Sequence, residues 1–185
     1  TRLCASAAFV KRGGTGVKFS MMQEFNSPLE LVLKAREVRY DLSPDLKKPD
    51  IFERREEGKL IKTKRRFQAS GQLTGSLKKF VPSETMEFVD HSVWDTEQKI
   101  HCWKIVSERF EKVIRWEGST RYEEVEESNG VKKTRREMQG EIKVSIPFIG
   151  DQLEKMMVSG FKKNFEKDYE TICKAIEILK ADQQQ

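Results

Sequence analysis

The chain has 185 residues, of which 37% are hydrophobic and 35% are charged, so one domain with a core of its own is expected. Its 35 basic and 30 acidic residues give a formal net charge of +5, which permits an anionic partner without requiring one. No apolar run reaches the roughly 20 residues that cross a bilayer, which argues against a membrane-spanning helix in this sequence.

The first 14 residues differ from the rest of the chain. Residues 3–10 are small and mostly apolar, and Lys11 and Arg12 follow them. A secretory signal has its basic residues before the apolar run, so we expect a disordered extension here, with a targeting segment as the alternative. Residues 15–180 are expected to form the single domain, and residues 181–185 a disordered tail.

A strand and a short helix open the predicted domain. Apolar and polar residues alternate over residues 17–25, which is the period of a β-strand. Ser27, Pro28 and Glu30 supply a capping hydroxyl, a first-turn proline and a reciprocal glutamate, and the apolar stripe that follows predicts a helix over residues 29–40. Residues 41–50 contain two prolines and form a connector with room for a further helical turn.

Six further strands are predicted before the C-terminal part of the chain. Alternating segments, broken by turn residues, place them at residues 51–57, 60–69, 84–94, 99–106, 112–126 and 131–146. Their close spacing requires antiparallel neighbours, because a parallel crossover needs a dozen or more residues. Asn129-Gly130, between the last two strands, is typical of a tight hairpin.

The alternation also predicts which side chains face the core. The inward residues of the last two strands are Ile114, Trp116, Gly118, Thr120, Tyr122, Met138, Gly140, Ile142, Val144 and Ile146. Gly118 and Gly140 lie inside strands and predict bends or a close approach of other groups. Over residues 84–94 the face with Phe88, Asp90 and Trp94 is inward, although Val89 and Val93 lie opposite, and over residues 99–106 the pattern favours neither face.

One long amphipathic helix is predicted over residues 151–179. Apolar side chains recur there at spacings of three and four, and charged residues fill most other positions. Pro147 and Gly150 end the preceding strand, and Asp151 with Glu154 is expected to cap the first turn. At about 1.5 Å per residue the helix would be roughly 40 Å long, so a broad surface must wrap around it.

This order of elements, with two passages of sequence, carries a resemblance to a known superfamily. The passages are F-N-S-P-L-E at residues 25–30 and G-E-I-K-V-S-I-P-F-I-G-D-Q-L-E-K at residues 140–155, on either side of the strand-rich middle. Over residues 17–179 the chain resembles the START-like superfamily, also called SRPBCC, helix-grip or birch-pollen-allergen-like, and within it an uncharacterised bacterial branch. The resemblance implies an α+β fold in which a curved antiparallel sheet of about seven strands wraps around the long helix.

The resemblance also implies a cavity between sheet and helix that binds or transports a hydrophobic small molecule such as a lipid. The candidate ligand-binding residues are Leu33, Trp116, Tyr122, Met138, Met157, Phe161 and Phe165. Methionine suits such a wall because its flexible thioether adapts to different ligands. The alternative for each of these residues is ordinary core packing.

An enzyme of the cyclase or hydrolase type is an alternative function. Asp90 would then be a desolvated general acid or base on the inner face. His91 and His101 are expected at the surface, and their spacing is not that of a metal site. The three cysteines are widely spaced and form no zinc or disulfide pattern, so we expect no metal or other cofactor and a cytoplasmic location.

Two basic runs, at residues 62–66 and 132–136, lie in predicted strands. Their outward members are expected to pair with acidic residues of neighbouring strands. The alternative is a protein-interaction module that uses Lys62, Lys64 and Arg66, or a transient contact with an anionic membrane surface. No aromatic platform accompanies these cations, which disfavours nucleic acid as a partner. The sequence leaves the oligomeric state open.

Overall fold

The computed structural model describes residues 16–42, 48–69, 86–107 and 110–182 of the chain. In chain order the elements are β1 (Val17–Phe25), α1 (Leu29–Leu42), β2 (Asp50–Glu57), β3 (Leu60–Ala69), β4 (Met86–Asp95), β5 (Ile100–Val106), β6 (Ile114–Glu126), β7 (Lys132–Val144) and α2 (Gly150–Asp182). All strands and helices expected from the sequence are present, with ends that differ by a few residues. Residues 181 and 182, expected in a disordered tail, belong to α2. The expectations for residues 1–14, for the middle of the connector and for residues 70–83 lie outside the described residues.

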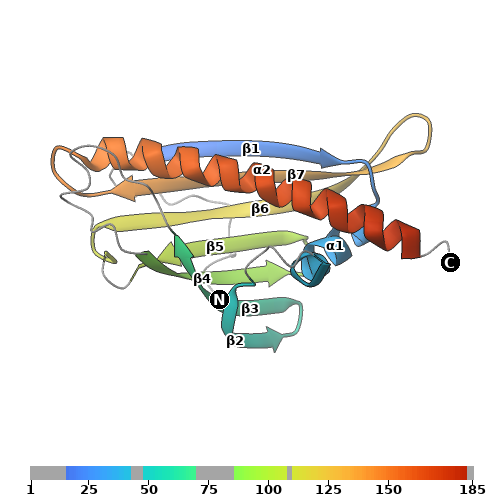
Figure 1. Cartoon of the computed structure of the whole chain (residues 1–185), viewed down its shortest axis with the longest axis horizontal. Helices are drawn as coiled ribbons and strands as arrows, with labels where there is room; N and C mark the ends of the chain where they lie inside the picture. The colour runs from blue at the N-terminus through green and yellow to red at the C-terminus, as the bar shows by residue number, and fades with distance from the viewer. Residues whose placement is uncertain (1–15, 43–47, 70–85, 108–109, 183–185) are drawn as a thin grey trace.

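The seven strands form one antiparallel sheet in the order β1-β7-β6-β5-β4-β3-β2 (Figure 1). Strands β2 to β7 pair in chain order as a meander, and β1 joins the free edge of β7. Gly58 and Gly130, in the β2–β3 and β6–β7 turns, have φ angles of 60° and 78°, a backbone conformation that glycine adopts at little cost. The predicted Asn129-Gly130 turn is therefore confirmed.

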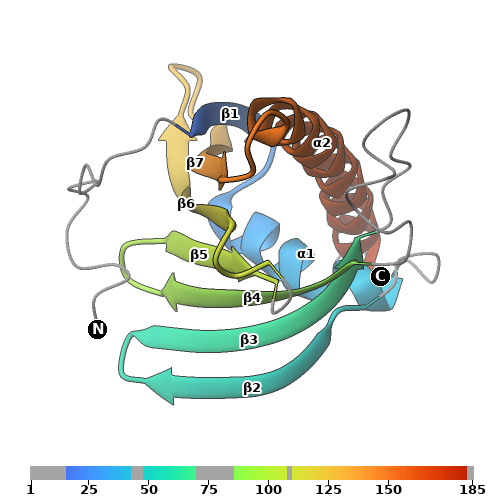
Figure 2. The ribbon, with the colours of Figure 1, turned by 90° about the vertical axis from the view of Figure 1, so that its left-hand side faces the viewer.

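The sheet curves around α2, as the end-on view shows (Figure 2). Gly118 on β6 and Gly140 on β7 are cross-strand neighbours inside this curve. A Cβ atom at Gly118 would lie 2.5 Å from Trp103 Cζ2, and one at Gly140 would lie 2.7 Å from Phe19 Cζ. The close approach predicted for both glycines is confirmed, because aromatic rings rest on the strands where side chains are missing.

Helix α2 is fastened to β7 by Glu154. The side chain of Glu154 is only 1% accessible; its Oε1 accepts a hydrogen bond from the backbone N–H of Val144 at 2.8 Å and lies 3.2 Å from Lys143 Nζ. The expected capping role of Glu154 in the first turn of α2 is therefore wrong. The carboxylate instead satisfies the N–H of Val144, which lies beyond Ile142, the last residue of β7 that pairs with β1.

The core divides into two clusters along α2. The first lies between the sheet and the N-terminal half of α2 and includes Phe19, Phe88, Trp103, Ile105, Trp116, Ile142, Val144, Leu153 and Val158. The second lies where α1 packs on the C-terminal half of α2 and includes Phe25, Val32, Ala35, Tyr122, Ile172, Ala175, Ile176 and Leu179. Neither helix in the described part of the chain is long and apolar enough to cross a membrane.

Candidate functional site

The concave face of the sheet carries a group of aromatic side chains beneath α2. The ring centroid of Phe161, on α2, lies 5.2 Å from that of Trp116 and 5.5 Å from that of Trp103. Phe19 is 5.3 Å from Phe161, and Phe88 is 6.0 Å from Trp116. We call these five residues the inner aromatic cluster. Because its members come from β1, β4, β5, β6 and α2, the curve of the sheet alone brings them together.

Four of the seven predicted ligand-binding residues meet at the inner aromatic cluster. Trp116 and Phe161 are members of it. Met138 and Met157, from β7 and α2, are partly buried and pack against the same core cluster. These four side chains therefore pack together between the sheet and α2.

The other three predicted residues lie elsewhere. Leu33 and Tyr122 belong to the second core cluster, between α1 and α2. Phe165 is buried one helical turn beyond Phe161, where its ring faces the guanidinium carbon of Arg136 at 4.1 Å. Phe165 is thus occupied by a cation–π contact within the protein, which leaves it less suited to a ligand.

Sequence reasoning missed Phe19 and Trp103 as site residues. The alternation in β1 carried a signal for Phe19, because Val17, Phe19 and Met21 share a face. For Trp103 no such signal existed, since both faces of residues 99–106 contain apolar side chains. The pairing of β5 with β6 places Trp103 opposite Gly118, and this register shows that Trp103 is on the inner face of β5.

Polar atoms without partners point to an interior that can donate hydrogen bonds to a bound molecule. Trp103 Nε1, Trp116 Nε1 and Thr120 Oγ1 are buried and have no hydrogen-bond partner among the described residues. Buried polar groups are nearly always hydrogen-bonded, because an unmade bond costs about 1–3 kcal/mol. A bound molecule with acceptor atoms beside the two indoles would satisfy these donors.

Asp90 lies on the inner face of β4, as expected, but it is not a free acid. Its Oδ2 accepts a hydrogen bond from Arg65 Nε at 2.6 Å, across the β3–β4 pair. The Arg65 side chain keeps 29% of its surface accessible although it faces the concave side of the sheet. The second oxygen of Asp90, Oδ1, is buried without a partner among the described residues. Asp90 therefore holds Arg65 in the interior and retains one acceptor atom.

His101 lies on the inner face of β5, so the surface position expected for it is wrong. It pairs with Trp94 on one side and Thr120 on the other, and its ring centroid is 6.5 Å from that of Trp94. Burial lowers the pKa of His101 well below 6.5, and the positive charges of Arg36, Arg65 and Arg39 lower it further. The imidazole is therefore neutral at pH 7 and can act as a hydrogen-bond donor or acceptor.

A second buried ion pair joins α1, β7 and α2. Asp168 Oδ2 lies 2.6 Å from Arg136 Nη1, and Asp168 Oδ1 lies 3.0 Å from Arg39 Nε. Burial disfavours the charge of Asp168, but Arg39 and Arg136 outweigh it and lower the pKa of Asp168 below 3.8. Gln23 Oε1 and the carbonyl oxygen of Phe165 accept further hydrogen bonds from Arg136. These contacts hold the two helices and the sheet in register.

The two basic runs are divided between the faces of the sheet. Their outward members form ion pairs with neighbouring acids, namely Lys62 with Glu57, Lys64 with Glu53, Arg66 with Asp50 and Glu87, Lys133 with Glu127, and Arg135 with Glu24. Arg65 and Arg136, from the same runs, project inward instead. The outward cations are thus largely compensated, whereas the inward ones belong to the interior.

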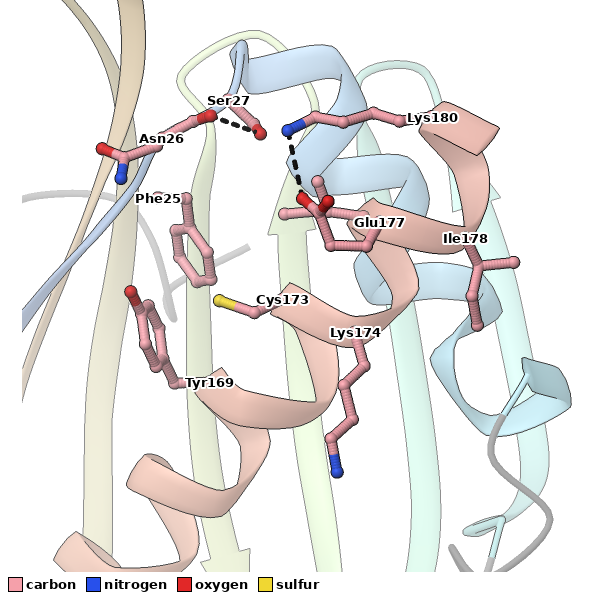
Figure 3. A pocket seen from close by; sticks show the side chains of 10 residues that line it. Phe25, Asn26, Ser27, Tyr169, Cys173, Lys174, Glu177, Ile178 and Lys180 are labelled. Atoms are coloured by element: carbon pink, nitrogen blue, oxygen red, sulfur yellow. Dashed lines mark hydrogen bonds and ion pairs between the residues drawn. The ribbon is translucent and has the colours of Figure 1, made fainter. Parts of the chain in front are cut away.

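A groove of about 590 Å³ lies where the end of β1 meets the last turns of α2 (Figure 3). Its lining residues are Phe25, Asn26, Ser27, Tyr169, Cys173, Lys174, Ile176, Glu177, Ile178 and Lys180. Burial raises the pKa of the Cys173 thiol, which disfavours the reactive thiolate. Within the described residues, no three His, Cys, Asp or Glu side chains converge in a way that could hold a metal ion. The groove therefore offers shape and apolar surface but no reactive group.

Two of the solved structures that share this fold illustrate the likeness. TTHA0849 from Thermus thermophilus matches with a TM-score of 0.60 and 16% identity over 88% of this chain and 99% of that chain. The Zhui aromatase/cyclase from Streptomyces sp. R1128 matches with a TM-score of 0.54 and 10% identity over 88% of this chain and 92% of that chain. At these identities the likeness shows the helix-grip arrangement of sheet and long helix alone.

The sequence itself matches one protein family. No curated protein matches the chain significantly. A family profile described as "Protein of unknown function (DUF2505)" matches residues 36–176, which run from α1 almost to the end of α2 and include most of the inner aromatic cluster. The chain therefore belongs to the DUF2505 family.

Proposed function

We propose that this helix-grip protein, as a member of the START-like superfamily, binds a hydrophobic small molecule such as a lipid between the concave face of the sheet and α2. The observation that carries the proposal is the pair of buried indole N–H groups, of Trp103 and Trp116, that lack partners among the described residues. They flank Phe161, which is itself only partly buried. The fold is shared with a protein named as an aromatase/cyclase, which supports a small molecule as the ligand.

The energy of binding would come from apolar contact, and the polar atoms would set orientation. Each square ångström of apolar ligand surface removed from water contributes about 25 cal/mol before the entropic costs of binding. Met138 and Met157 can change rotamer around ligands of different shape. The N–H groups of Trp103 and Trp116 would donate to an acceptor on the ligand.

The test is native mass spectrometry of freshly purified protein, followed by organic extraction of anything that it carries. Met138→Trp places a larger side chain on the concave face and should reduce ligand occupancy about tenfold or more. Met22→Trp is the matched control, because Met22 lies on the adjacent strand, points to the opposite face and is 61% exposed. This control should carry the ligand as the parent protein does.

Two results would overturn the proposal. One is a ligand that stays bound in Met138→Trp but is lost in Met22→Trp, which would place the site on the outer face. The other is a protein that purifies without a ligand and remains free of one after incubation with lipid extracts.

Conversion of the bound molecule is a second candidate function, favoured by the neutral imidazole of His101 on the same face of the sheet as the ion pair of Arg65 and Asp90. A neutral imidazole can accept a proton from a substrate at pH 7. The extracted compound, incubated with the protein, should then yield a product of different mass or chromatographic retention. His101→Gln should abolish this conversion and leave binding intact; equal conversion by both proteins would rule out His101.

A further inference from the structure

Six charged side chains lie on the concave side of the sheet, on β3, β4, β7 and the two helices. They are Arg36, Arg39, Arg65, Asp90, Arg136 and Asp168. Asp90 pairs with Arg65, and Asp168 is shared between Arg39 and Arg136. Four guanidinium groups thus face two carboxylates, and the described part of the chain leaves this group of residues with an excess of positive charge. Partly buried positive charge in excess attracts an anion more strongly than the same charge in water does.

Arg36 is the member without a carboxylate. Its guanidinium carbon lies 5.2 Å from the ring centroid of Trp94 and 5.5 Å from that of Tyr122, both on the concave face of the sheet. No acidic side chain in the described ranges forms an ion pair with Arg36. The two rings orient the guanidinium and stabilise its charge in part, but they do not neutralise it. Its donors thus remain available to an anion.

The position of Arg36 relative to His101 follows from Trp94, which contacts both. The ring centroid of Trp94 lies 6.5 Å from that of His101 and 5.2 Å from the guanidinium carbon of Arg36. Burial first, and then the charges of Arg36, Arg65 and Arg39, lower the pKa of His101, in agreement with this arrangement. Arg65 is paired with Asp90, whereas Arg36 is attracted to Asp168 without contacting it, because Arg39 and Arg136 form the ion pairs with that carboxylate. Arg36 is therefore the least compensated of these cations. An anion beside His101 would therefore experience a favourable electrostatic potential.

The charged group adjoins the inner aromatic cluster directly. Trp103 is two residues from His101 on β5, so both side chains project from the same face of that strand. Thr120, directly opposite His101 on β6, is buried and its Oγ1 has no partner among the described residues. The concave face therefore changes from aromatic to cationic between Trp103 and His101, with an unused hydroxyl at the boundary.

We propose that the ligand carries an acidic group, a carboxylate or a phosphate, which Arg36 binds, while its apolar body lies over the inner aromatic cluster. This inference rests on the proposed function, because it names the class of ligand for the same interior. Arginine suits either anion, since its planar guanidinium donates two parallel hydrogen bonds to oxygen pairs. Thr120 Oγ1 would donate a further hydrogen bond where the anion joins the apolar body.

The first experiment compares probes that differ only in charge, using the unmodified protein. Anilinonaphthalene sulfonate and phenylnaphthylamine share an aromatic body and both fluoresce on leaving water, but only the first is an anion. Dodecanoic acid and dodecanol form a linear pair, and displacement of the fluorescent probe reports their binding. The acidic member of at least one pair should bind about tenfold or more tightly than its neutral partner. Dodecyl phosphate, compared with dodecanoic acid, distinguishes the two kinds of anion.

The second experiment assigns the preference to Arg36. Arg36→Gln should reduce the affinity for the preferred acid about tenfold and leave the affinity for its neutral partner unchanged. Lys34→Gln, an exposed change of equal charge on the same helix, should leave both affinities unchanged. Circular dichroism of both variants establishes that they fold, and the comparison of probes with the unmodified protein does not depend on either of them.

The outcomes separate this inference from the function on which it rests. If acidic and neutral probes bind equally, the interior is a hydrophobic site, and the inference that the ligand carries an acidic group is wrong. An acid preference that is the same in Arg36→Gln and in the parent protein would likewise overturn the role of Arg36. If no probe of either kind binds, the proposed function fails together with the inference.

Discussion

Asp168 on α2 and Arg136 on β7 form an ion pair beneath the helix, with 2.6 Å between Oδ2 and Nη1 and only 2% of the Arg136 side chain accessible. The Arg136 guanidinium also lies between the rings of Phe25 and Phe165, at 5.4 Å and 4.1 Å from their centroids. The pair therefore sets the position of α2 over the sheet. It also fixes the interior in which a ligand is proposed to bind.

Asp168→Asn should destabilise the protein by about 3 kcal/mol, because Arg136 and Arg39 would both lose their anionic partner in a buried place. This value is the lower end of the usual range, since Asp168 keeps 30% of its side chain accessible. Urea unfolding at pH 7 measures the difference. Glu166→Gln, an exposed change of the same kind on the same helix, should alter stability by less than about 0.5 kcal/mol. Equal stability of the two variants would show that the pair contributes nothing to holding α2.

Glu154→Ala should destabilise the protein by about 2 kcal/mol more than Glu170→Ala. Both changes replace glutamate by alanine on α2 and gain similar helix propensity. Glu154→Ala alone leaves the buried N–H of Val144 without an acceptor, whereas Glu170 is exposed. Denaturant unfolding of the two variants gives the difference directly. A difference near zero would mean that another group takes over the Val144 N–H.

Two glycine substitutions should act in opposite directions. Gly118→Ala should destabilise by about 1–3 kcal/mol, because the new methyl group would overlap the carbonyl oxygen of Gln139 and the ring of Trp103. Gly160→Ala should stabilise by about 1 kcal/mol, since Gly160 lies exposed in α2 with open space around its Cβ position. Thermal unfolding followed by circular dichroism tests both. Stabilisation by Gly118→Ala would show that the curve of the sheet does not depend on the close approach of Trp103.

The fold followed from the sequence because its signals were local. Alternation, turn residues and the long amphipathic stripe each act within one element, and a meander of short connections leaves few ways to arrange the strands. The inward face of β6 followed in the same way, which is why Trp116 was found. The sequence also placed Asp90 on the inner face of β4.

The charged half of the interior was not predicted, although one part of it could have been. Extending the inward alternation of Met138, Gly140 and Ile142 by one step places Arg136 on the same face, yet the basic run around it was interpreted as a surface feature. His101 and Arg36 had no comparable signal. The position of the His101 side chain depends on the register between β4 and β5, and that of Arg36 depends on how α1 packs over Trp94. Tertiary contacts set both positions.

The half-buried position of His101 on the inner face of β5 predicts a pH dependence of stability. The pKa of His101 lies below 6.5 in the folded protein, first because of burial and then because of the nearby arginines, so the unfolded chain binds the proton more readily. Stability should therefore fall as the pH drops below 6.5, with a contribution from this group of at most about 1.4 kcal/mol per pH unit, and this contribution should be absent in His101→Gln. Urea unfolding at about pH 7.5 and about pH 5.5 compares the two proteins.

NMR titration of the imidazole ring protons, with His101→Gln to assign the resonance, measures the pKa of His101 itself. A midpoint at or above 6.5 would contradict the buried, cationic surroundings of His101. In Arg36→Gln the midpoint should move upward, because one of the charges that opposes protonation is removed.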